Sequence, residues 1–457
     1  MAHPLRVHRL DAWVDPADAF ATLFGRDDAD AVWLDSGPDA VAGRSFIGTG
    51  TLTATADVAG GTVTLAGETR SGGILDALRD DLGKRPHPET AAHPLGWWGR
   101  LGYEAGATAA GAPVATPDAP DAAPDAALLF VDRLIAFDHA TRTVDLVAVD
   151  APDSRAWVRT TTSRLRTAAG AARAHEVDHP VPAAAATWRH DAPAYLALIA
   201  ACQDAIRAGD AYQLCLTNRV RGRTAADPLA VHLRLRRASP APYAGFLRIG
   251  GDVLVSSSPE EFLRIDGRRV RTRPIKGTRP RGATIAADVE LRAELEASEK
   301  ERAENVMIVD LMRNDLGRVC VTGSVEVSHL LAVESYAQVH QLVSTVEGTL
   351  RPGLGAVDAL AACFPAGSMT GAPKLSAMRI LNRLEGGPRG AFAGCFGYLG
   401  VDGSADLAMV IRSIHFSDGV AAIGAGGGIT ALSVPEEELE EVRVKAAAVL
   451  AAAGITP

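Results

Sequence analysis

The sequence predicts an α+β protein, in which antiparallel strands and helices occupy separate stretches of the chain. Short runs of alternating apolar and polar residues, separated by glycine and proline, fill residues 1–150 and predict antiparallel strands. Residues 286–314 contain no proline or glycine and carry apolar residues at helical spacing. Later strands alternate with helices, but without the regular strand–helix–strand repeat of a parallel sheet.

The first part of the chain predicts mainly strands. Two helices are expected there, over residues 73–84 and 153–174. The strands are predicted in residues 30–37, 44–58, 61–68, 127–138 and 143–149. Residues 175–191 have the composition of a linker. We therefore expect a sheet-rich region over residues 1–175 and a second region over 190–457, joined as one intertwined globular unit.

The second part of the chain predicts strands and helices in turn. Helices are expected over residues 192–208, 228–238, 286–314, 356–364 and 375–384, and a last one begins near Ser433. Strands are expected over residues 211–220, 246–258, 319–328, 339–350, 395–401, 407–416 and 420–428. Ser433 and Glu436 have capping-box spacing, which favours a helix start at Ser433.

Composition and charge exclude several classes of function. The chain has 457 residues and a net charge of −9, whereas a nucleic-acid-binding surface requires clustered basic residues. The first residues lack the apolar core of a signal peptide, and no apolar run reaches the roughly 18 residues that span a bilayer. We expect a cytoplasmic protein that binds neither nucleic acid nor membrane.

The five cysteines predict no disulfide or zinc site. They stand singly in apolar surroundings, with no Cys-x-x-Cys pair, and are expected to be buried: Cys202, Cys215, Cys320, Cys363 and Cys395. Cys395 is close to the Gly-x-nucleophile-x-Gly pattern, but Ala393 replaces its first glycine.

Lys276 is the most reactive-looking lysine of the chain. It lies in Pro274-Ile-Lys-Gly277-Thr, where proline restricts the backbone before it and glycine frees the backbone after it. Such a turn can aim a side chain. The alternative is a solvated lysine at the end of a strand, because a buried ammonium without a partner is costly.

Two pairs of glutamates repeat one spacing on two predicted helices. Glu301 and Glu304 are three residues apart, as are Glu438 and Glu441, so each pair lies on one helix face. Their neighbour Lys300 is expected on another face. If the pairs converge, their like charges need compensation, and carboxylates are ligands that Mg²⁺ prefers. The alternative is two solvated acidic faces.

Three further features are consistent with a pocket for a small diacid. Residues 424–428 form a glycine-rich run whose amides can bind an anion, although a tight turn has the same pattern. Arg412 is flanked by strand-forming apolar residues and needs an anionic partner, which a carboxylate can provide. Tyr398 offers a hydroxyl donor or, alternatively, packs in a sheet.

Six motifs make the chain resemble the chorismate-utilising enzymes, the group of anthranilate, aminodeoxychorismate, isochorismate and salicylate synthases. They occur in the family's order and span residues 195–447. The motifs are SSSPEEF, PIKGTRPRG, KERAENVMIVDLMRNDLGRV, FPAGSMTGAPK, GCFGY with the later IRS, and AGGGI with the later glutamates. The resemblance implies two antiparallel sheets packed as a β-sandwich with helices outside, and Mg²⁺-bound chorismate between them.

The resemblance also implies roles for individual residues. Glu304 and Glu441 correspond to direct metal ligands, and Glu301 and Glu438 to ligands through water. Glu260 corresponds to the general acid for the departing C4 hydroxyl. The implied substrate-binding residues are Gln213, Thr278, Ser368, Thr370, Tyr398, Arg412, Gly426, Gly427 and Gly428. His340 is the candidate catalytic histidine. Gln341 holds the position where many relatives have histidine, and adjacent strand residues face opposite ways, so the roles of His340 and Gln341 remain open at this point.

Two positions favour the ammonia-using aminodeoxychorismate branch of the family. Gln213 stands where water-using members have an activating lysine, and Lys276 stands where anthranilate synthases have alanine. Asn305, where anthranilate synthases often have histidine, agrees. The implied reaction is covalent catalysis, in which Lys276 attacks chorismate and ammonia then displaces it to give 4-amino-4-deoxychorismate, the precursor of 4-aminobenzoate and folate. Covalent attack requires neutral Lys276, so its pKa is expected to be lowered by burial or a nearby cation.

The resemblance further implies a partner and a second ligand site. No glutaminase motif occurs in this chain, so a glutamine amidotransferase subunit is expected to supply ammonia. Trp97, Trp98 and the WLDSG motif fall where relatives form an aromatic amino-acid site, or are ordinary core residues. The competing interpretations are an anthranilate synthase large component, an isochorismate or salicylate synthase, and a noncatalytic chorismate-binding relative.

Overall fold

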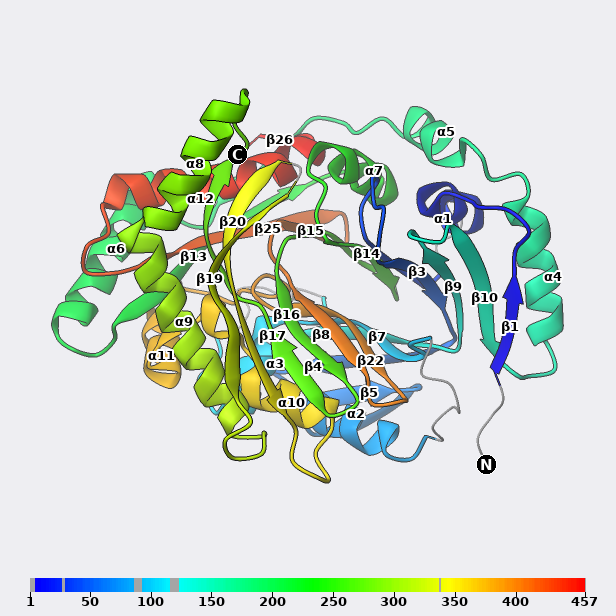
Figure 1. Ribbon diagram of the computed structural model, residues 1–457, viewed down its shortest axis with the longest axis horizontal. Coiled ribbons are helices and arrows are strands. Elements are labelled where there is room, and N and C mark those ends of the chain that lie inside the picture. Colours follow the sequence, from blue (N-terminus) through cyan, green and yellow to red (C-terminus); the bar gives the residue numbers. More distant parts are fainter. Residues whose placement is uncertain (1–4, 27–28, 86–92, 116–122, 337, 457) are drawn as a thin grey trace.

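The computed structural model describes residues 5–26, 29–85, 93–115, 123–336 and 338–456. Within them, two large antiparallel sheets face each other and most helices cover their outer faces (Figure 1). This confirms the predicted α+β sandwich. Both sheets combine strands from before residue 150 with strands from after residue 190. No helix in the described part of the chain is both long enough and apolar enough to cross a membrane.

The first sheet has 12 strands among the described residues. Their spatial order is β1 (Leu5–Arg9), β10 (Thr143–Val149), β9 (Arg133–Asp138), β3 (Arg44–Thr49), β2 (Ala31–Asp35), β14 (Tyr243–Ile249), β15 (Asp252–Ser258), β24 (Ser413–Ser417), β25 (Val420–Ile429), β13 (Gln213–Arg223) and β12 (Thr187–Trp188), with β21 (Gly371–Ala372) beside β13. The glycine-rich end of β25 pairs with the start of β13, where Cys215 lies opposite Gly428.

The second sheet also has 12 strands within the described ranges. Their order is β18 (Ile275–Pro280), β20 (Val339–Thr349), β17 (Arg269–Thr272), β16 (Glu261–Asp266), β23 (Ala405–Met409), β22 (Cys395–Gly400), β7 (Gly96–Leu101), β8 (Ala126–Val131), β4 (Leu52–Asp57), β5 (Thr62–Leu65) and β6 (Glu68–Ser71), with β19 (Glu326–Ser335) beside β20. A short parallel pair joins β11 (Ala184–Ala185) to β26 (Ile455–Thr456).

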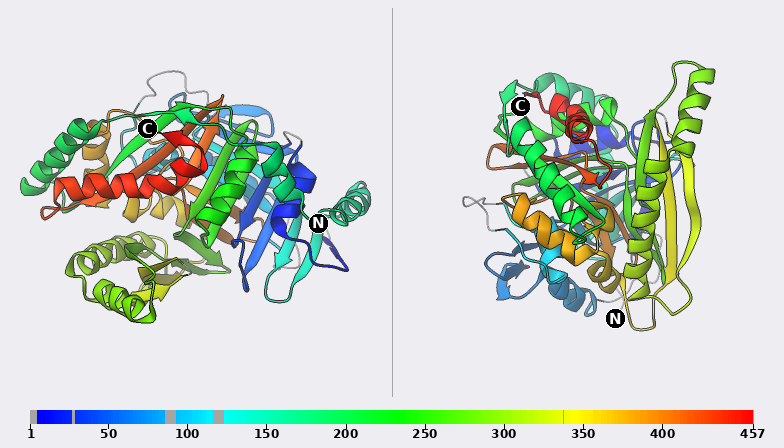
Figure 2. Two further views of the ribbon diagram at one scale, coloured as in Figure 1. Left: turned by 90° about the horizontal axis from the view of Figure 1, so that it is seen from above. Right: turned by 90° about the vertical axis from the view of Figure 1, so that its left-hand side faces the viewer.

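The helices follow the apolar periodicity of the sequence in most places. Their bounds are α1 (Pro16–Phe24), α2 (Ile74–Leu82), α3 (Tyr103–Ala109), α4 (Ser154–Leu165), α5 (Ala171–Asp178), α6 (Ala192–Arg207), α7 (Pro228–Ala238), α8 (Ile285–Ala297), α9 (Glu299–Gly317), α10 (Ala356–Cys363), a 3₁₀ turn at Gly367–Met369, α11 (Lys374–Leu384) and α12 (Pro435–Ala452). Seen from above and from the left, α8 and α9 lie with β19 and β20 on one side of the body (Figure 2).

Three helix predictions are wrong in detail. The helix predicted over 286–314 is two helices, because Ser298 is extended and its hydroxyl caps α9 at the amide of Glu301. The helix predicted over 153–174 breaks before Gly170, whose positive φ of 81° begins α5. The last helix starts at Pro435 rather than Ser433, because the Ser433 hydroxyl accepts a hydrogen bond from the Thr430 amide instead of capping the helix.

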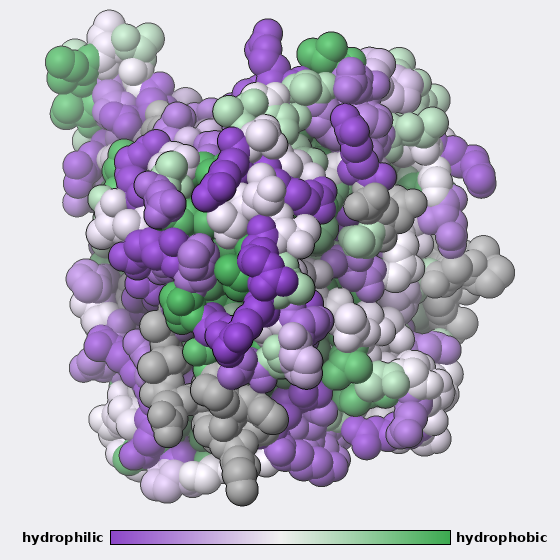
Figure 3. Space-filling model, turned by 90° about the vertical axis from the view of Figure 1, so that its right-hand side faces the viewer, coloured by the Kyte–Doolittle hydropathy of each residue, from purple (hydrophilic) through white to green (hydrophobic). Residues whose placement is uncertain are grey.

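Apolar residues pack in three main layers. Between the sheets, Trp98 and Leu129 of the second sheet meet Leu254 of the first. Outside the first sheet, α6, α7 and α12 bury their apolar faces, and outside the second sheet α2, α9 and α10 do the same. Removing this surface from water is the main stabilising term for such a sandwich. On the face that carries β1 and α4, hydrophilic side chains separate small apolar patches (Figure 3).

A buried ionic cluster joins the two sheets. Arg100 of β7 donates two hydrogen bonds to Asp252 of β15, at 2.8 and 2.5 Å, and His415 of β24 lies 2.6 Å from the same carboxylate. Burial raises the pKa of Asp252, but Arg100 and His415 lower it more, so its pKa lies below its usual range. The cluster therefore links the two sheets in their interior.

Candidate active site

Three carboxylates from two helices approach the glycine run of β25. A Cβ atom on Gly427 would lie 3.2 Å from Glu438 Oε2 and 3.8 Å from Glu441 Oε1, both on α12. A Cβ atom on Gly428 would lie 3.5 Å from Glu304 Oε2 on α9. The predicted convergence of the two helices at the glycine run is therefore present, and a side chain at either glycine would fill the space beside the carboxylates.

Each of the four predicted carboxylates has a cationic partner. The pairs are Lys276 Nζ with Glu304 Oε2 at 4.0 Å, Lys300 Nζ with Glu438 Oε1 at 3.2 Å, Lys445 Nζ with Glu441 Oε1 at 2.5 Å, and Arg279 Nη1 with Glu301 Oε1 at 3.6 Å. These contacts offset repulsion between like charges that are brought close together. Burial raises the pKa of Glu304, whereas Lys445 holds the pKa of Glu441 below its usual value despite burial.

Lys276 points from β18 into this cluster. Its side chain is 14% exposed, so it is not the solvated lysine of the alternative interpretation. Gly277 follows it with φ of 84°, and a Cβ there would lie 3.0 Å from Glu301 Cβ, so glycine lets β18 approach α9. Burial lowers the pKa of Lys276, but Glu304, Cys215 and Glu260 raise it, and the net pKa lies above its ordinary value. The amine is therefore protonated as the site stands, contrary to the lowered pKa expected from the sequence.

Glu260 is a buried carboxyl at the start of β16. Its exposed fraction is 5%, and it accepts a hydrogen bond of 2.9 Å from Ser368 Oγ. Burial raises its pKa to about 7, although Lys276 and the Ser368 hydrogen bond act in the opposite direction. A carboxyl with this pKa can donate a proton near neutral pH, as a general acid must.

Gln213 is the first residue of β13, and its side-chain amide lies beside Gly428. A Cβ on Gly428 would collide with Gln213 Nε2. Gln213 is 1% exposed, and its Oε1 atom is buried without a hydrogen-bond partner among the described residues. An unpaired buried acceptor is costly in the free protein and is available to a donor on a ligand.

Arg412 and the glycine amides offer anion-binding groups. Arg412 is largely buried, which lowers its pKa, and its guanidinium has no hydrogen-bond or ion-pair partner in the described part of the chain. In β25, only Val420, Ala421 and Ala422 pair with β24, so residues 423–429 have a strand neighbour on one side only, within the described ranges. Alternate amides of such a strand face the open side.

Four predicted site residues have other surroundings. Tyr398 is not brought to the glutamates but lines a separate cavity, where its ring lies 5.9 Å from that of Trp98. The two ring nitrogens of His340 lie 2.8 Å from Ser335 Oγ and 3.0 Å from Asp288 Oδ1, so its catalytic role stays a prediction. The Thr370 hydroxyl donates to the backbone carbonyls of Ala366 and Gly367. Thr278 is exposed.

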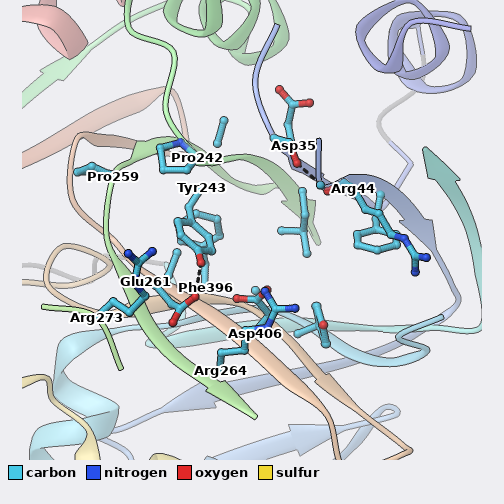
Figure 4. A pocket seen from close by; sticks show the side chains of 18 of the residues that line it. Asp35, Arg44, Pro242, Tyr243, Pro259, Glu261, Arg264, Arg273, Phe396 and Asp406 are labelled. Carbon is cyan, nitrogen blue, oxygen red and sulfur yellow. Dashed lines mark hydrogen bonds and ion pairs between the residues drawn. The ribbon is translucent and has the colours of Figure 1, made fainter. Parts of the chain in front are cut away.

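The separate cavity has a volume of about 540 Å³ and lies between the sheets (Figure 4). Tyr243 donates a 2.6 Å hydrogen bond to Glu261 across it, and Arg264 lies 3.7 Å from Asp406. Burial raises the pKa of Asp406 to about 7. Leu34, Asp35 and Ser36 of the WLDSG motif line the cavity. Trp97 and Trp98 are fully buried and donate to Asp81 and the Pro94 carbonyl, as core residues.

The donor set fits a magnesium ion in its chemistry. Carboxylate oxygens from α9 and α12 lie beside the neighbouring residues Gly428 and Gly427, where the glycines leave space. No group of three or more His, Cys, Asp or Glu residues is arranged as a finished metal site among the described residues. The lysine contacts provide the compensating positive charge in this arrangement.

Three residues near the site were not predicted to belong to it, and one of them, Lys300, was expected on another face of its helix. Lys300 was expected on a different face from Glu304, but residues four apart are neighbours on a helix, and Lys300 reaches Glu438. Lys445, which also donates to the Gly426 carbonyl at 2.9 Å, carried no motif signal. Arg389 binds Glu385 and the Cys215 carbonyl beneath β13. The five cysteines are buried and unpaired, as predicted.

Comparison with known proteins shows which family the chain belongs to. The family model described as chorismate binding enzyme matches residues 31–451. Aminodeoxychorismate synthase of Streptomyces griseus is 46% identical over 421 residues, which cover 91% of this chain and 57% of that relative. The Streptomyces pristinaespiralis aminodeoxychorismate synthase is 43% identical, covering 98% and 65%. The chain thus spans less than two thirds of the length of these two relatives.

Two anthranilate synthase components are also similar. Anthranilate synthase component 1 of Streptomyces coelicolor is 38% identical over 466 residues, which cover 98% of this chain and 88% of that protein. The crystal structure of anthranilate synthase component I from Streptococcus pneumoniae superposes with a TM-score of 0.78 at 28% identity, covering 90% of this chain and 93% of that one. The sequence is therefore similar to both kinds of enzyme, and the fold is similar to that of an anthranilate synthase component.

Proposed function

This chain belongs to the chorismate-binding enzyme family, and from this premise we propose that it is the large component of an aminodeoxychorismate synthase. The reaction is chorismate plus ammonia to 4-amino-4-deoxychorismate plus water. The observation that carries the proposal is the buried amine of Lys276, which shares its site with Glu304 and with the carboxyl of Glu260. A nucleophile and an acid in one site are what two successive substitutions need.

In the first step Lys276 acts as nucleophile. Once Glu304 is neutralised, Lys276 releases its proton to solvent and its neutral amine forms a bond to C2 of chorismate. Both ring double bonds then shift by one position, and the C4–oxygen bond breaks. Glu260 gives its proton to the departing hydroxyl, which leaves as water. The pKa of about 7 supports this role, because a sizeable fraction of Glu260 is protonated at neutral pH.

In the second step ammonia replaces the lysine. Its nitrogen bonds to C4, both ring double bonds shift back, and the C2–nitrogen bond to Lys276 breaks, so that the lysine leaves as the neutral amine. The Glu260 carboxylate accepts the proton that ammonia loses, which restores the acid for the next turnover. Gln213 Oε1, buried without a partner, is placed to accept a hydrogen bond from an incoming N–H donor.

The remaining site residues hold the substrate. Arg412 and the open amides of β25 near Gly426, Gly427 and Gly428 bind its carboxylates. Magnesium, held directly by Glu304 and Glu441 and through water by Glu301 and Glu438, would neutralise these side chains and bind a substrate carboxylate. Ser368 orients Glu260 through its hydrogen bond.

A glutamine amidotransferase subunit supplies the ammonia in this proposal. Free ammonia is scarce at neutral pH, and the chain itself contains no Gly-x-Cys-x-Gly sequence. Glutamine-dependent turnover should therefore require a glutaminase, whereas turnover with added ammonium should not. Glutamine-dependent turnover by this chain alone would contradict the assignment of the partner.

A second candidate, an anthranilate synthase large component, has one observation in its favour. This chain covers 88% of the Streptomyces coelicolor anthranilate synthase component but only 57% and 65% of the two aminodeoxychorismate synthases. The two reactions differ in the enolpyruvyl group, which an anthranilate synthase releases as pyruvate.

Product analysis separates the candidates. The chain is incubated with chorismate, ammonium and Mg²⁺, and the product is identified by mass spectrometry while pyruvate is assayed in parallel. We expect an amino product that retains the enolpyruvyl group, with no pyruvate. Anthranilate with stoichiometric pyruvate would support the second candidate, and no conversion of chorismate would contradict both.

A further inference from the structure

Lys300 bridges the two helices that carry the site's glutamates. It lies in the first turn of α9, and its Nζ donates a 3.2 Å hydrogen bond to Glu438 Oε1 on α12. Glu438 is 2% exposed, whereas the Lys300 side chain is 49% exposed. A half-exposed ammonium therefore covers a buried carboxylate from the solvent side.

The two oxygens of Glu438 have different partners. Oε1 accepts hydrogen bonds from Lys300 and, at 2.7 Å, from Ser433 Oγ. Oε2 lies toward Gly427 and has no hydrogen bond from the described residues. Lys300 is the only cation bound to this carboxylate in the described part of the chain. Without Lys300, Glu438 would be a buried charge with a single hydroxyl donor.

Lysine is rare in this chain but common beside the four glutamates. The chain contains only five lysines among its 46 Lys and Arg residues, and three of them, Lys276, Lys300 and Lys445, contact these glutamates. Several other carboxylates of the fold, such as Glu261 and Asp252, instead bind arginine in paired hydrogen bonds. An ammonium is a compact point charge that binds a carboxylate through single hydrogen bonds, and it is displaced more easily than a guanidinium fork.

We propose that Lys300 is a displaceable counter-cation, which holds Glu438 while the site is free of metal and leaves it when a divalent cation binds between α9 and α12. This rests on the proposed function, in which Glu438 is a magnesium ligand through water. Lys300 is a positioning residue and does not contact substrate. It keeps Glu438 oriented before loading, and the metal must compete with it, so Lys300 weakens and gates magnesium binding.

The exposure of Lys300 makes the exchange physically simple. Its stem already lies half in solvent, so the ammonium can rotate into water without moving either helix. Lys276 differs, because it is 14% exposed and points inward. Displacement is therefore expected at Lys300 while Lys276 stays in the site.

Calorimetric titration of Mg²⁺ into the metal-free full chain tests this inference without an activity readout. Wild type is compared with Lys300→Met and with the matched control Arg302→Met. Arg302 is the exposed cation two residues along α9 and donates only to the Glu296 carbonyl among the described residues. Both variants remove one positive charge near the site, but only Lys300→Met removes the contact with Glu438.

We expect Lys300→Met to bind Mg²⁺ about tenfold more tightly than wild type, and Arg302→Met to bind like wild type. Tenfold corresponds to about 1.4 kcal/mol. The metal-free melting temperature of Lys300→Met should fall below that of wild type and recover at saturating Mg²⁺, because the ion then compensates Glu438. A Lys300→Arg variant should bind Mg²⁺ no more tightly than wild type.

Equal affinity in wild type and Lys300→Met, or equal gains in both methionine variants, would overturn the role of Lys300 while leaving the magnesium site intact. Weaker binding by Lys300→Met would also overturn it. Absence of Mg²⁺ binding in wild type and every variant would instead overturn both this inference and the magnesium part of the proposed function. Product analysis with chorismate and ammonium reports on the reaction independently.

Discussion

The ammonium of Lys276 on β18 lies 4.0 Å from Glu304 Oε2 on α9. The contact joins the strand of one sheet to the helix that carries the first glutamate pair. It explains why an amine that burial should deprotonate keeps a raised pKa. It also defines what the proposed chemistry requires, because Glu304 must be neutralised before Lys276 can act as a nucleophile.

Glu260 should set the alkaline limb of the pH profile. Its pKa of about 7 means that the protonated acid is lost as pH rises through 7, so kcat/KM for chorismate, at a fixed concentration of free ammonia, should fall above that pH. Glu260→Gln should lower the rate by roughly 10²- to 10⁴-fold and remove this limb. Ser368→Ala removes a hydrogen bond that lowers the pKa of Glu260, so the limb should move to higher pH. A limb that persists unchanged in Glu260→Gln would contradict the assignment.

Gly428→Ala should damage the site more than the fold. Its Cβ would collide with the side-chain amide of Gln213 and lie 3.5 Å from Glu304 Oε2, and the end of a flexible side chain can yield. We expect a raised KM or lowered kcat with little change in melting temperature. Gly424→Ala is the matched control on the same strand, where the Cβ meets the ring of Phe392, so it should cost about 1–3 kcal/mol of stability. The reverse pattern would mean that Gly428 serves packing alone.

Asp252→Asn should destabilise the sandwich strongly. The change leaves Arg100 buried without its carboxylate, a loss of about 3–5 kcal/mol in urea unfolding. Because the folded-state pKa of Asp252 lies below its ordinary 3.8, its contribution is complete well above that pH and disappears as pH falls. The difference between wild type and variant should therefore shrink in acid. Asp145→Asn, whose partner Arg9 is exposed, should change stability little, and equal effects from the two variants would argue against the inter-sheet cluster.

The cavity between the sheets should bind an aromatic amino acid. Aromatic rings of Phe46, Tyr243 and Tyr398 line it together with the carboxyl of Asp406. Because the pKa of Asp406 is about 7, its carboxylate becomes available to a ligand amine as pH rises, so affinity should increase between pH 6 and 8. Titration calorimetry with tryptophan tests this, and Asp406→Asn should weaken binding and abolish the pH dependence. No heat of binding from any aromatic amino acid would exclude the prediction.

Local signals made much of the architecture predictable. Proline and glycine boundaries and periodicity located helices such as α6 and α7 to within a residue or two. The break at Ser298 was also readable, since Ser298 and Glu301 have capping-box spacing. It was missed because the apolar periodicity continues across it. Gly170 gave a comparable signal between α4 and α5.

Site residues were predictable where a motif fixes them and not where tertiary packing does. Lys276, Glu260 and Glu304 lie together because each sits in a motif whose backbone aims it inward. Tyr398 points into the space between the sheets, but strand alternation does not say whether its hydroxyl lies near the glutamates or in the separate cavity, where it is found. His340 is held by α8, a contact that strand alternation alone cannot reveal.

The central claim is that Lys276 forms a covalent bond to the chorismate ring. Intact-protein mass spectrometry of the chain with chorismate and Mg²⁺, but without ammonia, tests it most directly. We predict an adduct with the mass of chorismate less one water, located on Lys276 by peptide mapping, absent from Lys276→Arg, and discharged to product when ammonium is added. Full aminodeoxychorismate formation by Lys276→Arg, with no adduct on the wild-type chain, would contradict the claim.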